Sequence, residues 1–218
     1  MDPKAPMRDR IVTAALECMR ERGVGGTTTR SVARRAGVSE GSIYNHFANR
    51  SELIVEAFGL ATEAIRGRAR ELEHLVGTGS VEENLVTLMA AVIDFFREIA
   101  PIVGSIVGDP ELRSWFTEGK VPGQEGGPLT PLTGVVEVSG YLEHEHEAGR
   151  LPGRGPWVVC ASMIIGACLH YVYLELLSPA GIAGLRPDDE TSPLAHSRAV
   201  VRALFDAHQE PGHRRGRS

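Results

Sequence analysis

Apolar residues recur at helical spacing along almost the whole chain, and this periodicity limits the fold more than any other feature. Ile11, Ala15 and Met19, for example, stand four residues apart, as they do on one face of an α-helix. Alternation of β-branched and polar residues over the length of a strand is missing from the 218 residues. The sequence therefore predicts an all-α fold of about nine helices.

Small polar residues and glycines mark the expected helix ends. Thr28 and Ser39 are expected N-caps, and Gly37 ends the short helix between them. Asn49, followed three positions later by Glu52, resembles the capping box at the start of a long helix. Further helices are expected over residues 81–100, where Pro101 kinks or ends the helix, and over 109–116, 129–149, 157–177 and 194–208.

Charge divides the chain into a basic and an acidic part. Residues 1–50 contain 9 Lys+Arg and 5 Asp+Glu, a net charge of +4. The whole chain contains 23 Lys+Arg and 28 Asp+Glu, so the residues after position 50 contain 14 Lys+Arg and 23 Asp+Glu, a net charge of −9. A basic N-terminal part on an acidic body indicates a polyanionic partner for the first part only.

The two short helices on either side of Gly37, expected over 28–36 and 39–47, fit the helix-turn-helix template. In that motif the second helix enters the major groove while the first crosses the phosphate backbone. Five apolar residues are expected to face inward and hold the helices together: Val32, Ala33, Val38, Ile43 and Phe47. A purely structural three-helix unit would not explain the arginines at positions 30, 34, 35 and 50.

This stretch resembles the TetR family of bacterial transcriptional regulators. The family pattern is roughly T-x-R-x-I-A-x-x-A-G-V-S-x-G-x-x-Y-x-H/Y-F-x-x-K-x-x-L. It is matched at Thr28, Arg30, Val32, Ala33, Ala36, Gly37, Val38, Ser39, Gly41, Tyr44, His46, Phe47, Arg50 and Leu53. The resemblance implies a cytoplasmic repressor that leaves a pseudo-palindromic double-stranded DNA operator when it binds a small, largely apolar effector. It also implies a homodimer formed through the last two helices.

The resemblance also assigns roles to single residues. Thr28 and Tyr44 would donate hydrogen bonds to phosphates, and Arg50, where the family usually has Lys, would neutralise one. Such contacts fix position rather than sequence preference. Base reading would fall to Thr29, Arg30, Glu40, Gly41, Ser42 and Asn45, and Ser39 and His46 complete the expected DNA-binding set.

Glu40 and Gly41 are unusual in a helix that contacts DNA, and each needs a separate explanation. Glu40 can accept a hydrogen bond from cytosine N4, or it can simply favour the helix N-terminus. Gly41 costs ~1 kcal/mol of helix propensity relative to alanine, and a close approach of its backbone to DNA is the expected reason. Because an acid facing phosphates repels them, Glu40 also suggests an alternative: a TetR-like regulator that has lost DNA binding and acts through a protein or small-molecule partner.

The acidic body is expected to be the sensor. We expect a helix-turn-helix DNA-binding domain at residues 1–55, an effector-binding and dimerisation domain at 56–210, and a disordered basic tail at 211–218. Apolar pockets with a few polar groups suit small ligands. The candidate lining residues are Met89, Phe96, Trp115, Phe116, Tyr141, Met163, Ala167, His170, Tyr171 and Leu174. Each of them also suits plain core packing, and His170 suits a core histidine bonded to a carbonyl.

Residues 157–177 are apolar on all sides and almost long enough to cross a bilayer. They include His170 and Glu175, and a helix of this kind can instead be buried between two protein surfaces. We expect burial and no membrane partner. One surface would be the core and the other a second subunit, with Ala161, Ile165, Cys168, Val172 and Leu176 as the second apolar stripe. Which stripe faces which surface stays open at this stage.

Neither catalysis nor a cofactor has support in the sequence. No nucleophile–base pair and no phosphate-binding loop stands out, so we expect no enzyme activity. His144 and His146 stand two residues apart, so on a helix they point in nearly opposite directions and cannot share a metal ion. The three cysteines lack a C-x-x-C pair, which fits a reducing compartment. The N-terminus has no apolar segment of the signal-peptide kind.

Overall fold

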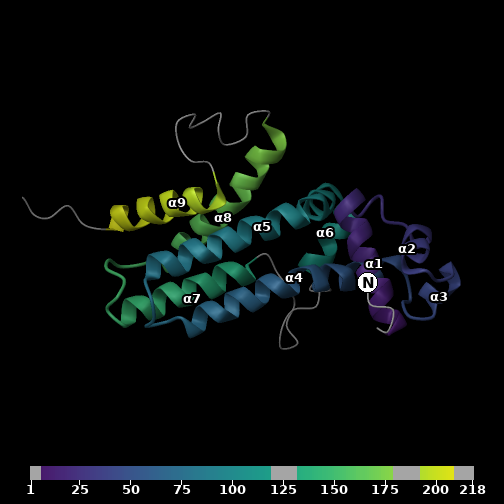
Figure 1. Cartoon of the computed structure of the whole chain (residues 1–218), viewed down its shortest axis with the longest axis horizontal. Helices are drawn as coiled ribbons and strands as arrows, with labels where there is room; N and C mark the ends of the chain where they lie inside the picture. Colours follow the sequence, from purple (N-terminus) through teal and green to yellow (C-terminus); the bar gives the residue numbers. More distant parts are fainter. Residues whose placement is uncertain (1–5, 119–131, 179–191, 209–218) are drawn as a thin grey trace, which may run out of the picture. The chain divides into compact units, whose positions relative to one another are not determined.

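The computed structural model describes residues 6–118, 132–178 and 192–208, and within them it contains nine α-helices and no strand (Figure 1). The helices are α1 (Met7–Arg22), α2 (Thr29–Ala36), α3 (Glu40–Tyr44), α4 (Arg50–His74), α5 (Val81–Gly108), α6 (Pro110–Thr117), α7 (Thr133–Glu147), α8 (Trp157–Leu177) and α9 (Pro193–His208). The predicted all-α class is confirmed. The predicted tail at 211–218 lies outside the described residues.

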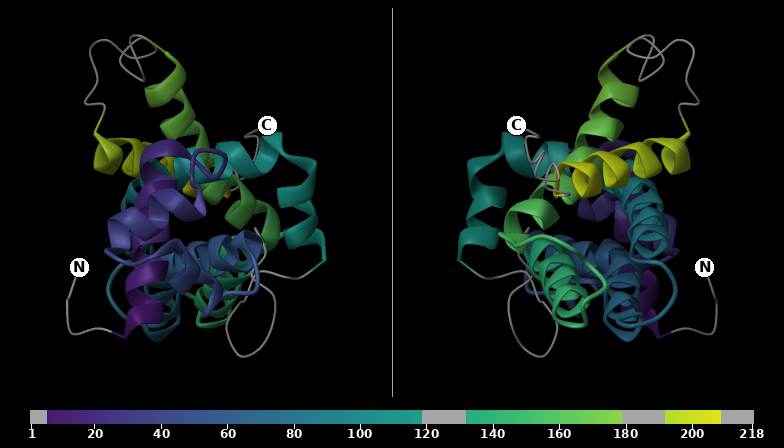
Figure 2. Two further views of the ribbon diagram at one scale, coloured as in Figure 1. Left: turned by 90° about the vertical axis from the view of Figure 1, so that its right-hand side faces the viewer. Right: turned by 90° about the vertical axis from the view of Figure 1, so that its left-hand side faces the viewer.

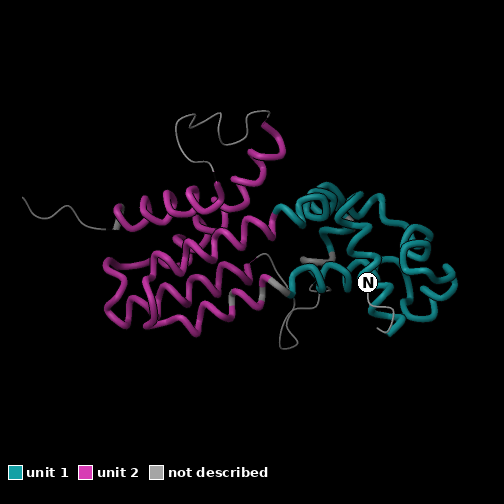
Figure 3. Tube along the Cα trace, in the orientation of Figure 1, with its two compact units in different colours: residues 1–64, 97–131 teal, residues 65–96, 132–218 magenta. Residues whose placement is uncertain are grey.

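The chain divides into two compact units (Figure 3). Unit 1 comprises Met1–Ala64 and Arg97–Pro131, and unit 2 comprises Ile65–Phe96 and Leu132–Ser218. The division passes through α4 and α5, so each of these helices begins in one unit and ends in the other. The predicted functional boundary near residue 55 stays a prediction.

The helix ends of unit 1 are fixed by the side chains that the sequence indicates. Thr28 Oγ1 accepts from the Ser31 N–H at 3.1 Å and Ser31 Oγ accepts from the Thr28 N–H at 3.0 Å, which is a complete capping box. Gly37 ends α2 in the left-handed conformation, with φ 69°. Ser39 Oγ accepts from the Ser42 N–H at 3.1 Å and caps α3. The caps predicted at these three positions are confirmed.

The start of α4 also follows the prediction. Asn49 Oδ1 accepts from the Glu52 N–H at 2.9 Å, and the Glu52 carboxylate accepts from the Ala48 N–H at 2.6 Å. The reciprocal bond therefore goes to the residue before the cap.

The core of the helix-turn-helix is apolar, as predicted. Val32, Ala33, Ile43 and Phe47 are buried, whereas Val38 is half-buried. The Arg8 guanidinium lies over the Phe47 ring, 4.8 Å from its centre, which adds a cation–π contact between α1 and the end of the motif.

Two helices differ in length from the expectation. Helix α3 ends at Tyr44 rather than near Phe47, because the N–H groups of His46 and Phe47 both donate to the Ile43 carbonyl at 2.9 Å and close the helix. Helix α5 does not end at Pro101 but continues to Gly108. Proline removes its own N–H donor and crowds the carbonyl four residues earlier, which favours a kink but does not stop the helix here. In the following turn the Ser105 hydroxyl donates to the Pro101 carbonyl at 2.8 Å.

In unit 2, α8 packs against α7 and α9 (Figure 2). The buried residues include Leu85 and Met89 of α5, Tyr141 of α7, and Ile164 and Cys168 of α8. Burial raises the pKa of the Cys168 thiol to about 12.

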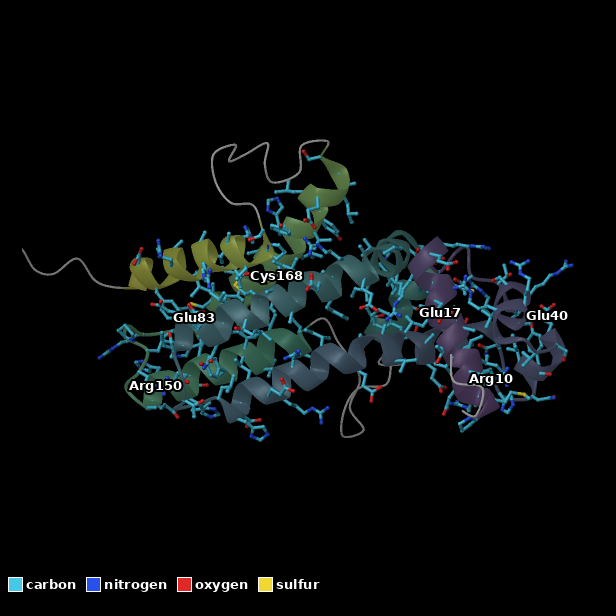
Figure 4. All side chains as sticks on the ribbon, viewed as in Figure 1. Arg10, Glu17, Glu40, Glu83, Arg150 and Cys168 are labelled. Carbon is cyan, nitrogen blue, oxygen red and sulfur yellow. The ribbon has the colours of Figure 1, made fainter. Side chains whose placement is uncertain are left out.

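One charged side chain, Glu145, is fully buried in unit 2. The Arg150 Nε lies 3.0 Å from its carboxylate, and the Gly77 N–H donates to it at 3.2 Å. Arg150 also donates to the Gly79 carbonyl at 2.6 Å, so this pair ties the α4–α5 loop to the end of α7 (Figure 4).

Candidate nucleic-acid interface and effector-binding unit

The predicted DNA-binding residues share one property in the structure, which is that none of them is buried. Thr28, Arg30, Ser39, Glu40, Gly41, Tyr44, Asn45 and His46 are exposed, and Thr29, Ser42 and Arg50 are half-buried. They come from α2, the turn after it, α3 and the start of α4. The structure therefore collects these residues on the accessible surface of a capped two-helix motif, and their role in DNA binding stays a prediction.

The N-terminal ends of α2 and α3 are joined by a hydrogen bond. The Thr29 hydroxyl donates to the Glu40 carboxylate at 2.5 Å (Figure 4). Glu40 therefore does more than favour the first turn of its own helix, because it also orients a predicted base-reading residue of the preceding helix. One carboxylate oxygen remains to accept a hydrogen bond from a base.

The arginines of this region divide into two groups. The carboxylate of Glu21 accepts from Arg35 at 2.6 Å, and this hydrogen bond raises the pKa of Arg35 above its ordinary value. Arg50 donates from Nε to the Thr27 carbonyl at 2.7 Å and from Nη2 to the Val24 carbonyl. Arg30 and Arg34, in contrast, are exposed on α2. The positive charge available at the surface is therefore carried more by α2 than by the predicted phosphate anchor at position 50.

No contact with the described part of the chain requires the glycine at position 41. A Cβ added there would meet only Ser39 Oγ, at 3.9 Å, which is an ordinary contact. The residue is exposed in the first turn of α3. The conformation of the chain therefore gives no reason for glycine here, and the approach of its backbone to DNA stays a prediction.

Comparison with known proteins now adds to this geometry. The sequence profile described as bacterial regulatory proteins of the tetR family matches residues 11–57. Residues 11–57 therefore match the N-terminal domain of the TetR family. The HTH-type transcriptional regulator BetI of Escherichia coli, from strains K12 and O139:H28 alike, is 30% identical over 87 residues. That match covers 40% of this chain and 45% of BetI, so the chain spans less than half the length of this relative.

Solved structures of TetR-family proteins share the fold over nearly the whole chain. A TetR-family regulator from Rhodococcus has a TM-score of 0.66 at 18% identity, over 91% of this chain and 98% of that one. One from Mesorhizobium loti has a TM-score of 0.62 at 19% identity, over 95% and 98%. FadR of Bacillus subtilis, solved in complex with stearoyl-CoA, has a TM-score of 0.55 at 20% identity, over 90% and 97%. At such identities the likeness shows the fold alone.

The predicted effector-binding residues differ in their burial, and their role stays a prediction. Met89, Tyr141 and Tyr171 are buried, and Phe96, Ala167 and Leu174 are half-buried. Met163 and His170 are exposed. The side chains of Trp115 and Phe116 lie outside the described residues. The Tyr141 hydroxyl accepts from the Asn84 amide at 3.0 Å, which gives this buried phenol a partner in the core of unit 2.

Unit 2 contains a cavity of about 20 Å³, which has room for about one water molecule. It is lined by Leu85, Leu142, Leu151, Trp157, Cys160, Ile164, Val201, Leu204 and Phe205, and none of them belongs to the predicted set. The sequence could not have selected them, because they come from four helices and one loop that only the packing brings together. An effector would have to enlarge this space or use another one.

Helix α8 is partly buried and partly exposed along its length. Ala161, Cys168 and Val172 are buried, whereas Val158, Val159, Met163, Tyr173, Leu176 and Leu177 are between 38% and 81% exposed. Both predicted stripes are divided in this way, because Tyr171 of the stripe with Met163 is buried and Leu176 of the stripe with Ala161 is exposed. Which stripe faces a pocket stays open. By length and composition alone α8 could cross a membrane, and its exposed apolar face equally suits a second protein surface.

Proposed function

We propose that this chain is a cytoplasmic, homodimeric transcriptional repressor that binds a pseudo-palindromic DNA operator and is released by a small, largely apolar effector. The exposed polar face of α2 and α3 carries this proposal, because its apolar partners Val32, Ile43 and Phe47 are buried directly beneath it. Each α3 would enter the major groove of one half-site, with the half-sites ~34 Å apart or at a related spacing.

The dimer would form through α8 and α9. The exposed side chains of Met163, Leu176 and Leu177 on α8 support this interface, as does Leu194 on α9. Burial of this apolar face against a second subunit would stabilise a soluble chain. A two-fold interface would also place two identical DNA-binding motifs so that each contacts one half-site of a palindromic operator. Met163→Glu would place a charge in this interface and should yield monomers by sedimentation velocity, whereas Glu175→Gln, on the same helix, should leave the dimer intact.

The effector would bind in unit 2 and lower the affinity for DNA. The apolar lining of the cavity around Trp157 and Ile164 supports an apolar ligand. A shift from 1:99 to 99:1 in favour of the released state requires ~5.5 kcal/mol of differential affinity. Since FadR of Bacillus subtilis was solved with stearoyl-CoA, this thioester is a reasonable first compound to test.

Selection from a pool of random duplexes, followed by fluorescence anisotropy, tests the DNA-binding step. Bound sequences should be pseudo-palindromic, and the logarithm of their affinity should fall linearly with the logarithm of the salt concentration. Tyr44→Phe removes one exposed phosphate donor, so it should weaken all duplexes equally. Ser42→Ala and Asn45→Ala should change the preferred sequence instead. If no duplex is enriched even at low salt, the proposal fails and the regulator without DNA binding becomes the better account.

A further inference from the structure

The turn between α1 and α2, residues 23–27, contains buried backbone although it is a loop. Val24 is fully buried and Thr27 is 1% exposed. Buried backbone groups need hydrogen-bond partners, and two of the partners lie within the turn. The Thr27 N–H donates to the Val24 carbonyl at 3.1 Å, and the Thr27 hydroxyl donates to the Gly23 carbonyl at 2.8 Å. The next residue along the chain, Thr28, is the N-cap of α2.

A further partner for this turn comes from α5, far away in the sequence. The Val24 N–H donates to Ser105 Oγ at 3.1 Å, and the same hydroxyl donates its proton to the Pro101 carbonyl at 2.8 Å. A hydroxyl has one donor and two acceptor sites, so it makes both bonds at once. Ser105 is thereby oriented by its own helix before it accepts from the turn.

The backbone of the turn also touches α5 directly. Gly23 has φ 67°, and a Cβ added to it would lie 2.5 Å from Ser105 Oγ and 3.1 Å from the Pro101 carbonyl oxygen. Both the conformation and the contact therefore require glycine at this position. Arg20 forms an ion pair with Glu98, which is a second link between α1 and the same part of α5.

Helix α4 holds the other side of the turn through Arg50. Its guanidinium donates to the carbonyls of Val24 and Thr27. The chain segment immediately before the N-terminus of α2 is thus fixed by residues of α1, α4 and α5 together, and the residues that make these contacts belong to unit 1.

We infer that Ser105 is a positioning residue for the DNA reader, because it lets the C-terminal part of α5 determine where the N-terminus of α2 lies. The inference depends on the proposed function in that α2 is taken to contact DNA. A displacement of α5 after Pro101 moves the acceptor of the Val24 N–H, and with it the turn that carries Thr28 to Arg30. Helix α5 begins in unit 2, so one continuous helix runs from the proposed effector-binding unit to Ser105, which the turn contacts through a hydrogen bond.

Ser105→Ala removes the acceptor without adding bulk, and Thr87→Ala is its matched control. Thr87 lies on the same helix and makes the same kind of bond, from its hydroxyl to the Glu83 carbonyl four residues earlier at 2.8 Å, but it is exposed and distant from the turn in sequence. Ser105→Thr keeps the hydroxyl at this position and serves as the conservative control that should behave like the wild type.

The first measurement is hydrogen exchange of the free protein. Ser105→Ala should raise the exchange rate of the Val24 amide about tenfold, while Thr87→Ala leaves it unchanged. Equal rates in the wild type and Ser105→Ala would overturn the inference. This result does not depend on DNA, so it separates a failure of the inference from a failure of the proposed function.

The second measurement uses the duplex that the wild type selects and a scrambled duplex. Ser105→Ala should weaken binding to the selected duplex about fivefold and change binding to the scrambled one less than twofold, because a misplaced α2 loses specific contacts but keeps its charge. DNA binding should also slow exchange over residues 102–108 in the wild type and in Ser105→Thr, but not in Ser105→Ala. A loss of thermal stability with an unchanged ratio of the two affinities would show a structural role only and would also overturn the inference.

Discussion

Replacement of Gly41 by alanine should make the protein more stable and its DNA binding weaker. The residue lies in the first turn of α3, and an added Cβ would meet only Ser39 Oγ at 3.9 Å. Alanine therefore fits without rearrangement, and it restores the helix propensity that glycine lacks. We expect the free energy of unfolding of this part of the chain to rise by about 0.5–1 kcal/mol.

The effect on DNA has the opposite sign. If the backbone of α3 lies against the duplex at Gly41, a Cβ pushes the helix away and removes at least one hydrogen bond to a charged phosphate. Such a bond contributes about 1.5–3 kcal/mol, which corresponds to about 10- to 150-fold weaker binding. Few mechanisms other than a close approach of the backbone would raise stability and lower affinity together.

The matched control is Gly59→Ala on α4. Gly59 is helical like Gly41, although it is half-buried whereas Gly41 is exposed. A Cβ added to Gly59 would meet nothing within 4 Å. It should give a similar gain in thermal stability and leave the anisotropy titration with the selected duplex unchanged. If Gly41→Ala binds that duplex as well as the wild type does, α3 does not approach DNA at this position and the reasoning fails.

Three further predictions follow from hydrogen bonds and burial. Thr28→Asp keeps the acceptor that caps α2, so the melting temperature should stay close to that of the wild type. DNA binding in an anisotropy titration should weaken about tenfold, because a carboxylate repels phosphate. An equal loss of thermal stability and of DNA affinity would contradict the phosphate role of Thr28. Burial raises the pKa of Tyr141 from 10.0 to about 12. Between pH 10 and pH 12 the phenol of Tyr141 ionises in the unfolded chain but stays neutral in the folded one, so the stability it contributes is complete below pH 10 and lost as the pH rises through 12. The free energy of unfolding should therefore fall by roughly 2–3 kcal/mol over that range. The fall should disappear in Tyr141→Phe. In urea unfolding, Arg150→Gln should cost roughly 1–3 kcal/mol more than Glu145→Gln, because Glu145 is fully buried while the Arg150 side chain is 27% exposed; equal costs would refute this asymmetry.

Features that depend on neighbouring residues could be predicted from the sequence. The caps at Thr28, Ser39 and Asn49 form bonds that span three residues, so their signals are complete within one turn of the chain. The buried set of the helix-turn-helix follows in the same way from periodicity. The ends of α3 and α5 do not follow from such local signals, and a proline alone does not decide whether a helix bends or stops.

Features that depend on distant residues could not be predicted. Arg50 matches a family position that usually holds Lys, but its carbonyl partners stand 23 and 26 residues away. The cavity lining in unit 2 needs the packing of several helices. Helix α8 is apolar on all sides, so periodicity gives no preferred face, and the buried stripe could only be identified once α7 and α9 were in place.

The predicted boundary near residue 55 is therefore a poor place to separate a DNA reader from the rest of the chain. A fragment that ends there lacks Ser105, so the buried Val24 N–H has no acceptor, and it lacks Glu98, so Arg20 loses its ion pair. It also exposes the contact surface that makes glycine necessary at position 23. An unpaired buried donor alone costs about 1–3 kcal/mol, a large share of the stability of a small helical unit. The family motif ends before α5, but the contacts that hold the turn before α2 extend to Ser105. We therefore expect a fragment that folds like the proposed DNA reader to need the C-terminal part of α5.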